Sequence, residues 1–228
     1  MSIDQILTMP DDVKPPLSRE KILAVAMNMA DEQGLQGLSM RKLADELGVK
    51  AMSLYNHVKN KDDLIDGLVE KVVAEIPIPD ISKPWKAELA NRGMKAHQVL
   101  MRHPWASVPL VSRANVGPNM MSYVNATLGC LIEAGFSPAL ADHAWNAMDN
   151  YIYGFTLQSL NFPFKEGEYQ QVAQQYLPSL PKAQWPYLYA LSEKVAMGEH
   201  DGVNHFEFGF EFILDGLEGL LNRTLNSE

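Results

Sequence analysis

Cysteine is almost absent from this sequence, and so are long apolar runs. Cys130 is the only cysteine among 228 residues, so an internal disulfide is excluded, which fits a reducing compartment. No apolar stretch approaches the roughly 18 residues that a membrane-spanning helix needs. Residues 1–16 contain acidic residues and prolines instead of a basic start and an apolar run, so we expect no signal peptide. We therefore expect a cytoplasmic protein that does not contact a membrane.

Positive charge is also scarce, which at first argues against a nucleic-acid partner. Lys and Arg number 19 against 28 Asp and Glu, and the net charge is −9. The balance is uneven along the chain, because residues 18–61 carry a net charge of +2 and the remainder carries −11. The acidic remainder repels phosphate, so the slightly basic segment is the surface that DNA can approach.

Motifs for catalysis or metal binding are missing as well. The six histidines form no pair at the i, i+4 spacing of a helical zinc site, and the acidic residues form no ligand cluster. The sequence has no phosphate-binding glycine loop and no nucleophile elbow. We expect no catalytic residue, no metal and no cofactor. Two alternative hypotheses stay open: an enzyme or metal protein, and a helical small-molecule-binding adaptor whose DNA-binding head does not function.

Apolar residues recur at helical spacing along the whole chain, with no alternating strand pattern and no internal repeat. This pattern predicts an all-α protein. Residues 1–17 are predicted to be a flexible tail, and segment 197–205 is the expected loop of the C-terminal half. Prolines and glycines delimit the helices. We expect helices from Ser18 to Gly34, from Ser39 to Gly48, around Leu54 and Val58, from Asn60 to Ile76, and near 85–102, 105–111, 118–134, 138–162, 169–177, 182–196 and 206–224.

Residues 38–61 are the most informative segment, because they predict two short helices around a glycine turn. Ser39 is placed to cap the first of them, and Gly48 is placed to turn the chain into the next. On that next helix Leu54 and Val58 share the inner side. Its outer side carries Met52, Ser53, Tyr55 and Asn56.

The outer side suits the reading of a DNA groove. Asn makes paired hydrogen bonds to adenine, hydroxyl groups bond phosphates or base edges, and Met or Ala contacts a thymine methyl group. Arg41 is placed to reach a phosphate or a guanine. The helix starts after Ser39 and Asn60 offer free N–H groups to phosphate, and Lys61 adds charge there. The alternative is that these residues are the solvated face of a small three-helix bundle.

The same region resembles a known family. Residues 18–76 are similar to the N-terminal domain of the tetracycline-repressor-like (TetR) transcription regulators, and the block from Leu54 to Lys61 is similar to the tetracycline-repressor branch itself. The resemblance is carried by Ile22, Ala26, Gly34, Leu38, Ser39, Met40-Arg-Lys-Leu-Ala44, Leu47-Gly-Val49, Leu54-Tyr55, His57-Val-Lys-Asn-Lys61 and Leu64.

The resemblance implies a homodimer that binds a palindromic operator in double-stranded DNA, normally as a repressor. Residues 18–62 would form the helix-turn-helix domain, with Ser39 at the start of its second helix. Base contacts would come from Arg41, Ala51, Met52, Ser53, Tyr55 and Asn56, with His57 and Lys61 helping to hold the DNA backbone.

Residues 63–228 resemble the family's ligand-binding and dimerisation domain more loosely, through Trp85, Arg102-His-Pro104, Gly135-Phe-Ser137 and Tyr153-Gly-Phe155. Segments 138–162 and 206–224 are predicted to form a four-helix bundle across a two-fold axis. The alternative is that both segments pack inside one subunit. Their apolar stripes comprise Leu140, Ala144, Met148, Ile152, Phe155 and Leu160, and Phe206, Phe210, Ile213, Leu214, Leu217, Leu220 and Leu221.

We also expect a pocket for an unidentified small-molecule effector. Flexible Met side chains and aromatic rings suit adaptable apolar ligands, although each of them also suits a core. Arg113 and Asp149 are the sharpest candidates, because a charge near an apolar centre needs a partner. The alternative to a ligand contact is that they pair with each other or are exposed. The candidate pocket residues are Met94, His97, Trp105, Arg113, Met120, Met121, Trp145, Asn146, Asp149 and Tyr153.

One departure from the family concerns the effector. In the tetracycline-binding branch, a histidine in the segment before the family's arginine helps to hold a metal-bound drug. The matching segment here is Val108-Pro-Leu-Val-Ser-Arg113, and Pro109 occupies the place of that histidine. The resemblance therefore argues against a tetracycline–magnesium effector.

Overall fold

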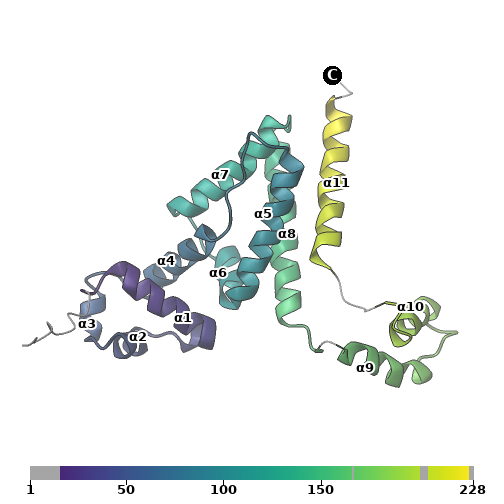
Figure 1. The fold of residues 1–228 in the computed structure, drawn as a ribbon, viewed down its shortest axis with the longest axis horizontal. Helices are drawn as coiled ribbons and strands as arrows, with labels where there is room; N and C mark the ends of the chain where they lie inside the picture. Colours follow the sequence, from purple (N-terminus) through teal and green to yellow (C-terminus); the bar gives the residue numbers. More distant parts are fainter. Residues whose placement is uncertain (1–15, 166, 201–204, 226–228) are drawn as a thin grey trace, which may run out of the picture. The chain divides into compact units, whose positions relative to one another are not determined.

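The computed structural model describes residues 16–165, 167–200 and 205–225, and every regular element in these ranges is a helix (Figure 1). The chain divides into two compact units, residues 1–68 and 69–228, which we describe separately. The predicted all-α fold is confirmed. Most of the predicted tail, residues 1–15, lies outside the described residues. Among the helices that the structure describes, none is long and apolar enough to cross a membrane.

The N-terminal unit contains helices α1 (Arg19–Gly37), α2 (Met40–Leu47) and α3 (Ala51–Leu54) and the first half of α4 (Lys61–Ala74). The Ser18 hydroxyl caps α1 by accepting from the Lys21 N–H at 3.2 Å. Gly34 breaks α1 with a φ of 68°, so the predicted stop is a kink inside the assigned helix. The Asn60 side chain caps α4, accepting from the Asp63 N–H at 2.8 Å.

The core of the N-terminal unit is built from one apolar side of each helix. Leu43 of α2 and Leu54 of α3 are fully buried, as are Leu64 and Leu68 of α4. Burying a leucine stabilises a fold by about 2 kcal/mol, so this core fixes how the short helices α2 and α3 are held. Helix α3 has only four residues and depends on such tertiary contacts.

In the C-terminal unit the helices α5, α8 and α11 run side by side, and α7 packs against α5 and α8 (Figure 1). Gly93 permits the close approach of α11 to α5, because a Cβ atom there would lie 2.3 Å from the Phe210 ring. The elements are α5 (Trp85–Arg102), the 3₁₀ turn η1 (Pro104–Ala106), α6 (Ser107–Ser112), α7 (Pro118–Glu133), α8 (Pro138–Leu160), α9 (Glu168–Tyr176), η2 (Leu177–Ser179), α10 (Pro186–Ala196) and α11 (Phe206–Leu225).

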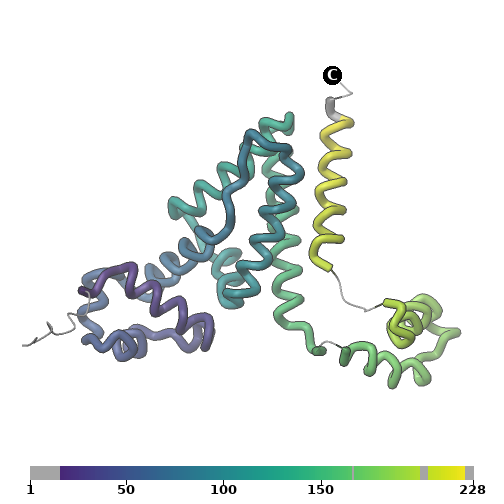
Figure 2. Tube along the Cα trace, viewed as in Figure 1, coloured from purple at the N-terminus to yellow at the C-terminus, as the bar shows by residue number. Residues whose placement is uncertain are grey.

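Helices α9 and α10 follow α8 and precede α11 in the chain, and they pack against each other (Figure 2). The Gln174 side-chain amide donates to the Ala196 carbonyl at 2.8 Å and ties the two helices together. The predicted helix 182–196 begins only at Pro186, because proline is favoured in the first turn of a helix. Residues 197–200 contain no helix, as the predicted loop requires, whereas residues 201–204 lie outside the described ranges.

Two further predictions need correction. The expected helix 105–111 is split into η1 and α6. The third helix ends at Leu54, so Tyr55 and Asn56 lie in the turn that follows it. That turn still keeps a helical hydrogen bond from the Val58 N–H to the Leu54 carbonyl at 2.9 Å.

The predicted dimer stripe of α11 is largely internal to the subunit. Phe206, Phe210 and Leu214 are each less than 4% exposed, because they pack toward α5 and α8 of the same chain. Met148 and Ile152 of α8 are fully buried in the same way. The prediction that these side chains face a second subunit was therefore wrong, since helical periodicity identifies an apolar side without saying what covers it.

Candidate DNA-binding and effector-binding sites

The turn between α2 and α3 has the geometry of a helix-turn-helix. Gly48 adopts a left-handed conformation with φ 67° and ψ 33°, which side-chain-bearing residues rarely adopt. Its N–H donates to the Asp45 carbonyl at 3.1 Å, and the Val49 N–H donates to the Ala44 carbonyl at 3.0 Å. These bonds end α2 and direct the chain into α3. The Ser39 hydroxyl caps the start of α2, accepting from the Lys42 N–H at 3.3 Å.

The candidate reading side chains lie on the outside of this turn, over a buried inner side. Leu54 and Val58 are at most 1% exposed, whereas Met52 is 75% exposed and Tyr55 is 47% exposed. The predicted division into inner and outer sides is therefore confirmed. Arg41 and Asn56 are exposed too, and Ala51, Ser53 and His57 are half-buried.

Arg19 fixes this arrangement, and the sequence analysis missed it. Its guanidinium donates to both carboxylate oxygens of Asp63, at 2.9 and 3.0 Å, and to the His57 carbonyl at 3.0 Å. The same carboxylate accepts from the Lys59 N–H at 2.7 Å. One ion pair thus joins α1, the end of the reading turn and the start of α4. The hydrogen bond from Arg19 holds the pKa of Asp63 below its ordinary value.

Lys61 is engaged within the N-terminal unit. Its ammonium group donates to the Leu35 carbonyl at 3.0 Å, although the side chain is exposed. A phosphate contact by Lys61 stays a prediction, and it requires this hydrogen bond to be exchanged for one to DNA.

In the C-terminal unit, the sharpest charged candidate has a partner that the sequence analysis did not name. Asp149 of α8 forms an ion pair of 2.5 Å with Arg92 of α5, and the Arg92 side chain is fully buried. The other oxygen of Asp149 accepts from the Trp145 indole N–H at 2.8 Å and from the Tyr153 hydroxyl at 3.1 Å. The Arg92 guanidinium lies 4.3 Å from the centre of the Tyr123 ring. We call these five residues the Arg92 cluster.

The Arg92 cluster gathers three of the predicted pocket residues, Trp145, Asp149 and Tyr153. Burial opposes the charge on Arg92, but Tyr123 and Asp149 outweigh that effect and raise its pKa. Burial also raises the pKa of the Tyr153 hydroxyl, so Tyr153 remains a neutral donor to Asp149. Helical spacing was the available signal for Arg92, because it shares one side of α5 with Leu89, Ala96 and Val99.

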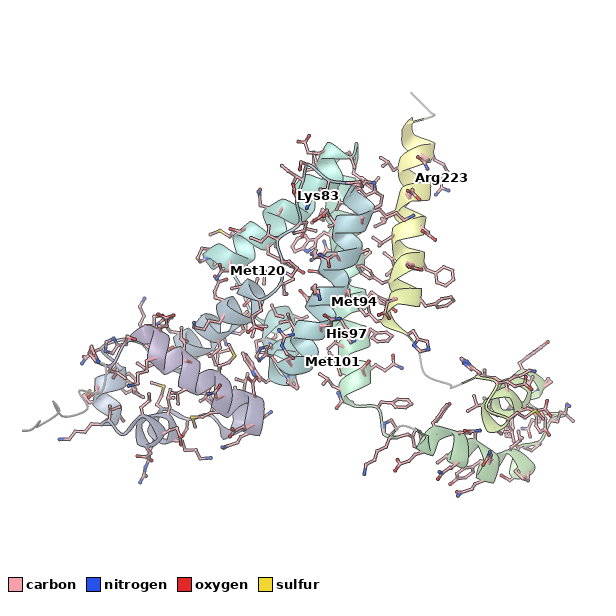
Figure 3. The ribbon with its side chains drawn as sticks, in the orientation of Figure 1. Lys83, Met94, His97, Met101, Met120 and Arg223 are labelled. Carbon is pink, nitrogen blue, oxygen red and sulfur yellow. The ribbon has the colours of Figure 1, made fainter. Side chains whose placement is uncertain are left out.

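His97 belongs to a different cluster. In Figure 3, Met94, His97 and Met101 follow one another along α5, and Met120 lies on α7. The His97 ring stacks on Phe206 of α11 with 4.6 Å between ring centres, and its Nδ1 lies 2.8 Å from the Thr156 hydroxyl of α8. Burial lowers the pKa of His97. His97 therefore packs between α5, α8 and α11.

The remaining pocket candidates are dispersed over the C-terminal unit. Trp105 of η1 is buried, and Met120 is buried on the same side of α7 as Tyr123. Met121 lies on the opposite side of α7 and is 57% exposed. Asn146 is exposed and bonds to Asp142 within α8. Met94 and Arg113 are half-buried. A role of these residues in ligand binding stays a prediction.

The position that departs from the tetracycline-binding branch is not a metal ligand here. Pro109 is buried in α6, and its ring has no donor atom for a metal. Across residues 16–165, 167–200 and 205–225, no group of three or more His, Cys, Asp or Glu side chains is arranged to hold a metal ion.

The fold and the α2–α3 turn define a helix-turn-helix regulator with a second helical domain. Residues 22–68 match the bacterial regulatory proteins of the tetR family, and residues 78–221 match the tetracycline repressor-like C-terminal domain. The two matches cover most of the sequence. The chain therefore belongs to the tetracycline repressor family of transcription regulators.

Several named proteins are similar to this chain in sequence. The HTH-type transcriptional repressor DrrR1 of Streptomyces coeruleorubidus is 31% identical over 226 residues, which cover 91% of this chain and 80% of that protein. The class D tetracycline repressor protein of Escherichia coli is 30% identical over 215 residues, 92% of this chain and 93% of that protein. An HTH-type transcriptional regulator of Saccharopolyspora erythraea is 37% identical over 142 residues, but these cover 62% of this chain and 60% of that protein.

A solved structure shows the same fold. The TetR family protein ActR of Streptomyces coelicolor, in complex with actinorhodin, superposes with a TM-score of 0.75 at 28% sequence identity. The superposition covers 90% of this chain and 98% of ActR.

The Arg19 ion pair generates a first prediction. Arg19→Met should destabilise the N-terminal unit by about 1 kcal/mol, a value at the low end for charged hydrogen bonds because Arg19 is partly exposed. Hydrogen exchange of the α3 amides measures the loss, with Lys42→Met, an exposed cation of α2, as the control. Because the folded pKa of Asp63 is lowered, the contribution is complete above about pH 4 and is lost as the pH falls further. Unchanged α3 exchange in Arg19→Met would contradict this role.

The buried ion pair generates a second prediction. Asp149→Asn should destabilise the C-terminal unit by about 3 kcal/mol, because it leaves the buried Arg92 charge without a counter-charge. The double variant Arg92→Met/Asp149→Leu should lose less stability than Asp149→Asn, since it removes both charges and keeps the volume, although Trp145 and Tyr153 lose their acceptor. Urea denaturation measures the free energy of unfolding of both variants. Hydrogen exchange of the α8 amides then measures the stability of the C-terminal unit. If the double variant is as unstable as the single one, the charge imbalance is not the cause.

Proposed function

We propose that the protein is a homodimeric repressor that binds a palindromic operator and leaves it when a small-molecule effector binds the C-terminal unit. The observation that carries the proposal is the α2–α3 turn, where exposed Met52, Tyr55 and Asn56 stand over fully buried Leu54. A rigid ridge of this kind fits the DNA major groove, and two copies related by a two-fold axis would read two half-sites about 34 Å apart. Regulation, and not catalysis, is the role that we assign.

A surface on α8 and α11 supports dimerisation. Phe208 is 66% exposed and Phe212 is 64% exposed, whereas the neighbouring stripe of α11 is buried. A cavity of about 380 Å³ opens between the two helices, lined by residues that include Gly154, Phe208 and Gly209. A Cβ atom at Gly154 or Gly216 would meet no neighbour within 4 Å. Two exposed phenylalanines beside such open space suit a second copy of the same surface, as in a two-fold dimer.

Helix α4 supports the coupling between effector and operator. Its first half carries Asp63, the partner of Arg19. Its second half carries Glu70, whose carboxylate accepts from the N–H groups of Asn119 and Met120 at the start of α7, at 2.8 and 3.1 Å. One continuous helix is thus bonded to the reading turn at one end and to the C-terminal unit at the other. A coupling of about 1–3 kcal/mol would change the affinity for the operator by roughly five- to 150-fold.

Relatives support the proposed binding of operator DNA and of a small-molecule effector. DrrR1 and the class D tetracycline repressor are named as repressors, and ActR was solved with actinorhodin bound. For this chain we propose operator DNA and an effector other than a tetracycline–magnesium complex, because Pro109 stands where the tetracycline-binding branch has its histidine. As a DNA-bound regulator it would act in the cytoplasm.

Selection of bound fragments from random double-stranded DNA tests the proposed function. The full chain should enrich a palindrome with two half-sites, and the complex should contain one dimer. Enrichment of a single unpaired half-site would contradict the dimeric reading, and absence of any enriched sequence would contradict operator binding.

The reading turn generates a third prediction. Asn56→Ala should weaken binding to the selected operator by about 1–3 kcal/mol and should affect random DNA much less, because a base contact is lost. Titration by fluorescence anisotropy at one fixed salt concentration measures both affinities. Glu32→Ala, an exposed residue of α1, serves as the control. Equal losses on operator and random DNA would show that Asn56 does not read sequence.

The α8–α11 surface generates a fourth prediction. Phe212→Glu should weaken dimerisation by roughly thirtyfold, equivalent to about 2 kcal/mol, because it places a charge in an apolar interface. Analytical ultracentrifugation measures the dissociation constant. Ile78→Glu, at another exposed apolar residue, should leave the dimer intact. A Phe212→Glu protein that sediments as the wild-type dimer would exclude this surface as the interface.

A further inference from the structure

The guanidinium of Arg92 has N–H donors for which the described residues provide no acceptor. Its Nη2 donates to Asp149, but Nε and Nη1 are buried and have no acceptor among the described residues. A buried donor without an acceptor costs about 1–3 kcal/mol, and more when it is charged, so such groups are rare unless a ligand or water completes them.

Other groups of the cluster are already occupied. Both carboxylate oxygens of Asp149 are engaged, one by Arg92 and the other by Trp145 and Tyr153. Asp149 is therefore positioned by three donors and neutralises the charge of Arg92. What remains is a set of N–H donors within an ion pair whose total charge is zero.

This charge balance indicates which acceptor fits. A cation, including a positively charged metal complex, would meet the guanidinium and its unsatisfied donors. An anion would leave a net negative charge in a buried site, which is costly. An uncharged carbonyl oxygen completes the donors without adding charge. The Tyr123 ring lies 4.3 Å from the guanidinium, and Trp145 and Tyr153 are bonded to its partner Asp149, so aromatic side chains adjoin the ion pair. Flat aromatic rings pack well against such side chains.

We infer that Arg92 is the hydrogen-bonding anchor for an uncharged, flat aromatic effector that carries a carbonyl oxygen. The inference rests on the proposed function, because it names the chemical class of the effector assumed there. Since Arg92 is fully buried, the effector reaches Nε and Nη1 only when the helices around the cluster separate. Binding is thereby tied to a movement of α5, α7 or α8. The start of α7 is bonded to Glu70 of α4, so such a movement reaches the helix that carries Asp63.

A matched pair of probes tests the inference. Fluorenone and fluorene have nearly the same shape, but only fluorenone carries a carbonyl oxygen. Calorimetric titration of the full chain should show that fluorenone binds roughly tenfold more tightly than fluorene, the effect of about one charge-assisted hydrogen bond. The negatively charged 9-oxofluorene-2-carboxylate should bind less tightly than fluorenone.

Variants identify the donor. In Arg92→Met/Asp149→Leu the preference for fluorenone should disappear while fluorene binding persists. Arg92→Lys keeps the charge but loses the Nε and Nη1 donors, so its preference should fall as well. Arg102→Met, which changes an exposed arginine of the same helix, should retain the full preference.

Several results would overturn the inference. These are equal affinity for both probes, no binding of either, or an unchanged preference in the double variant. A crystal structure of the fluorenone complex with only ordered water on Nε and Nη1 would overturn it too. Failure here is distinguishable from failure of the proposed function, because selection of a palindrome by the ligand-free wild-type protein does not involve these probes.

Discussion

The ion pair between Arg19 and Asp63 is the constraint on which the DNA-binding arrangement depends. Helix α3 is too short to be stable alone, and the turn after it contains the candidate reading residues Tyr55 and Asn56. By bonding the His57 carbonyl as well as Asp63, Arg19 fixes the end of that turn to both α1 and α4. A shift of α4 would therefore alter the position of the turn that carries Tyr55 and Asn56.

The same helix is the proposed route from the C-terminal unit to the reading turn. Glu70 bonds the first N–H groups of α7, and α7 carries Tyr123, whose ring covers the Arg92 guanidinium. Under the inference above, a ligand that engages Arg92 would move the packing around Tyr123 and, with it, the start of α7. The proposed control of DNA binding thus needs no contact between effector and DNA. It needs α4 to be bonded through Asp63 to the reading turn and through Glu70 to the start of α7.

Much of this architecture was predictable from the sequence, because it depends on local patterns. The serine caps, the left-handed Gly48 and the buried side formed by Leu54 and Val58 follow from helix periodicity and turn chemistry. What failed depends on packing across the chain. Asp149 pairs with Arg92, 57 residues away, and no local pattern indicates which of several charges meet inside a bundle. Periodicity also cannot tell whether an apolar stripe is covered by its own subunit or by another, so it did not show that Phe206, Phe210 and Leu214 are covered within the subunit.

The central claim is that the α2–α3 turn enters the major groove of operator DNA. A crystal structure of the full chain with its selected palindrome tests this claim most directly. The account predicts one dimer per palindrome, with Met52, Tyr55 and Asn56 of each protomer against base edges and the Arg19–Asp63 bonds intact. A complex in which DNA lies on any other surface, or in which these three side chains face solvent, would contradict it.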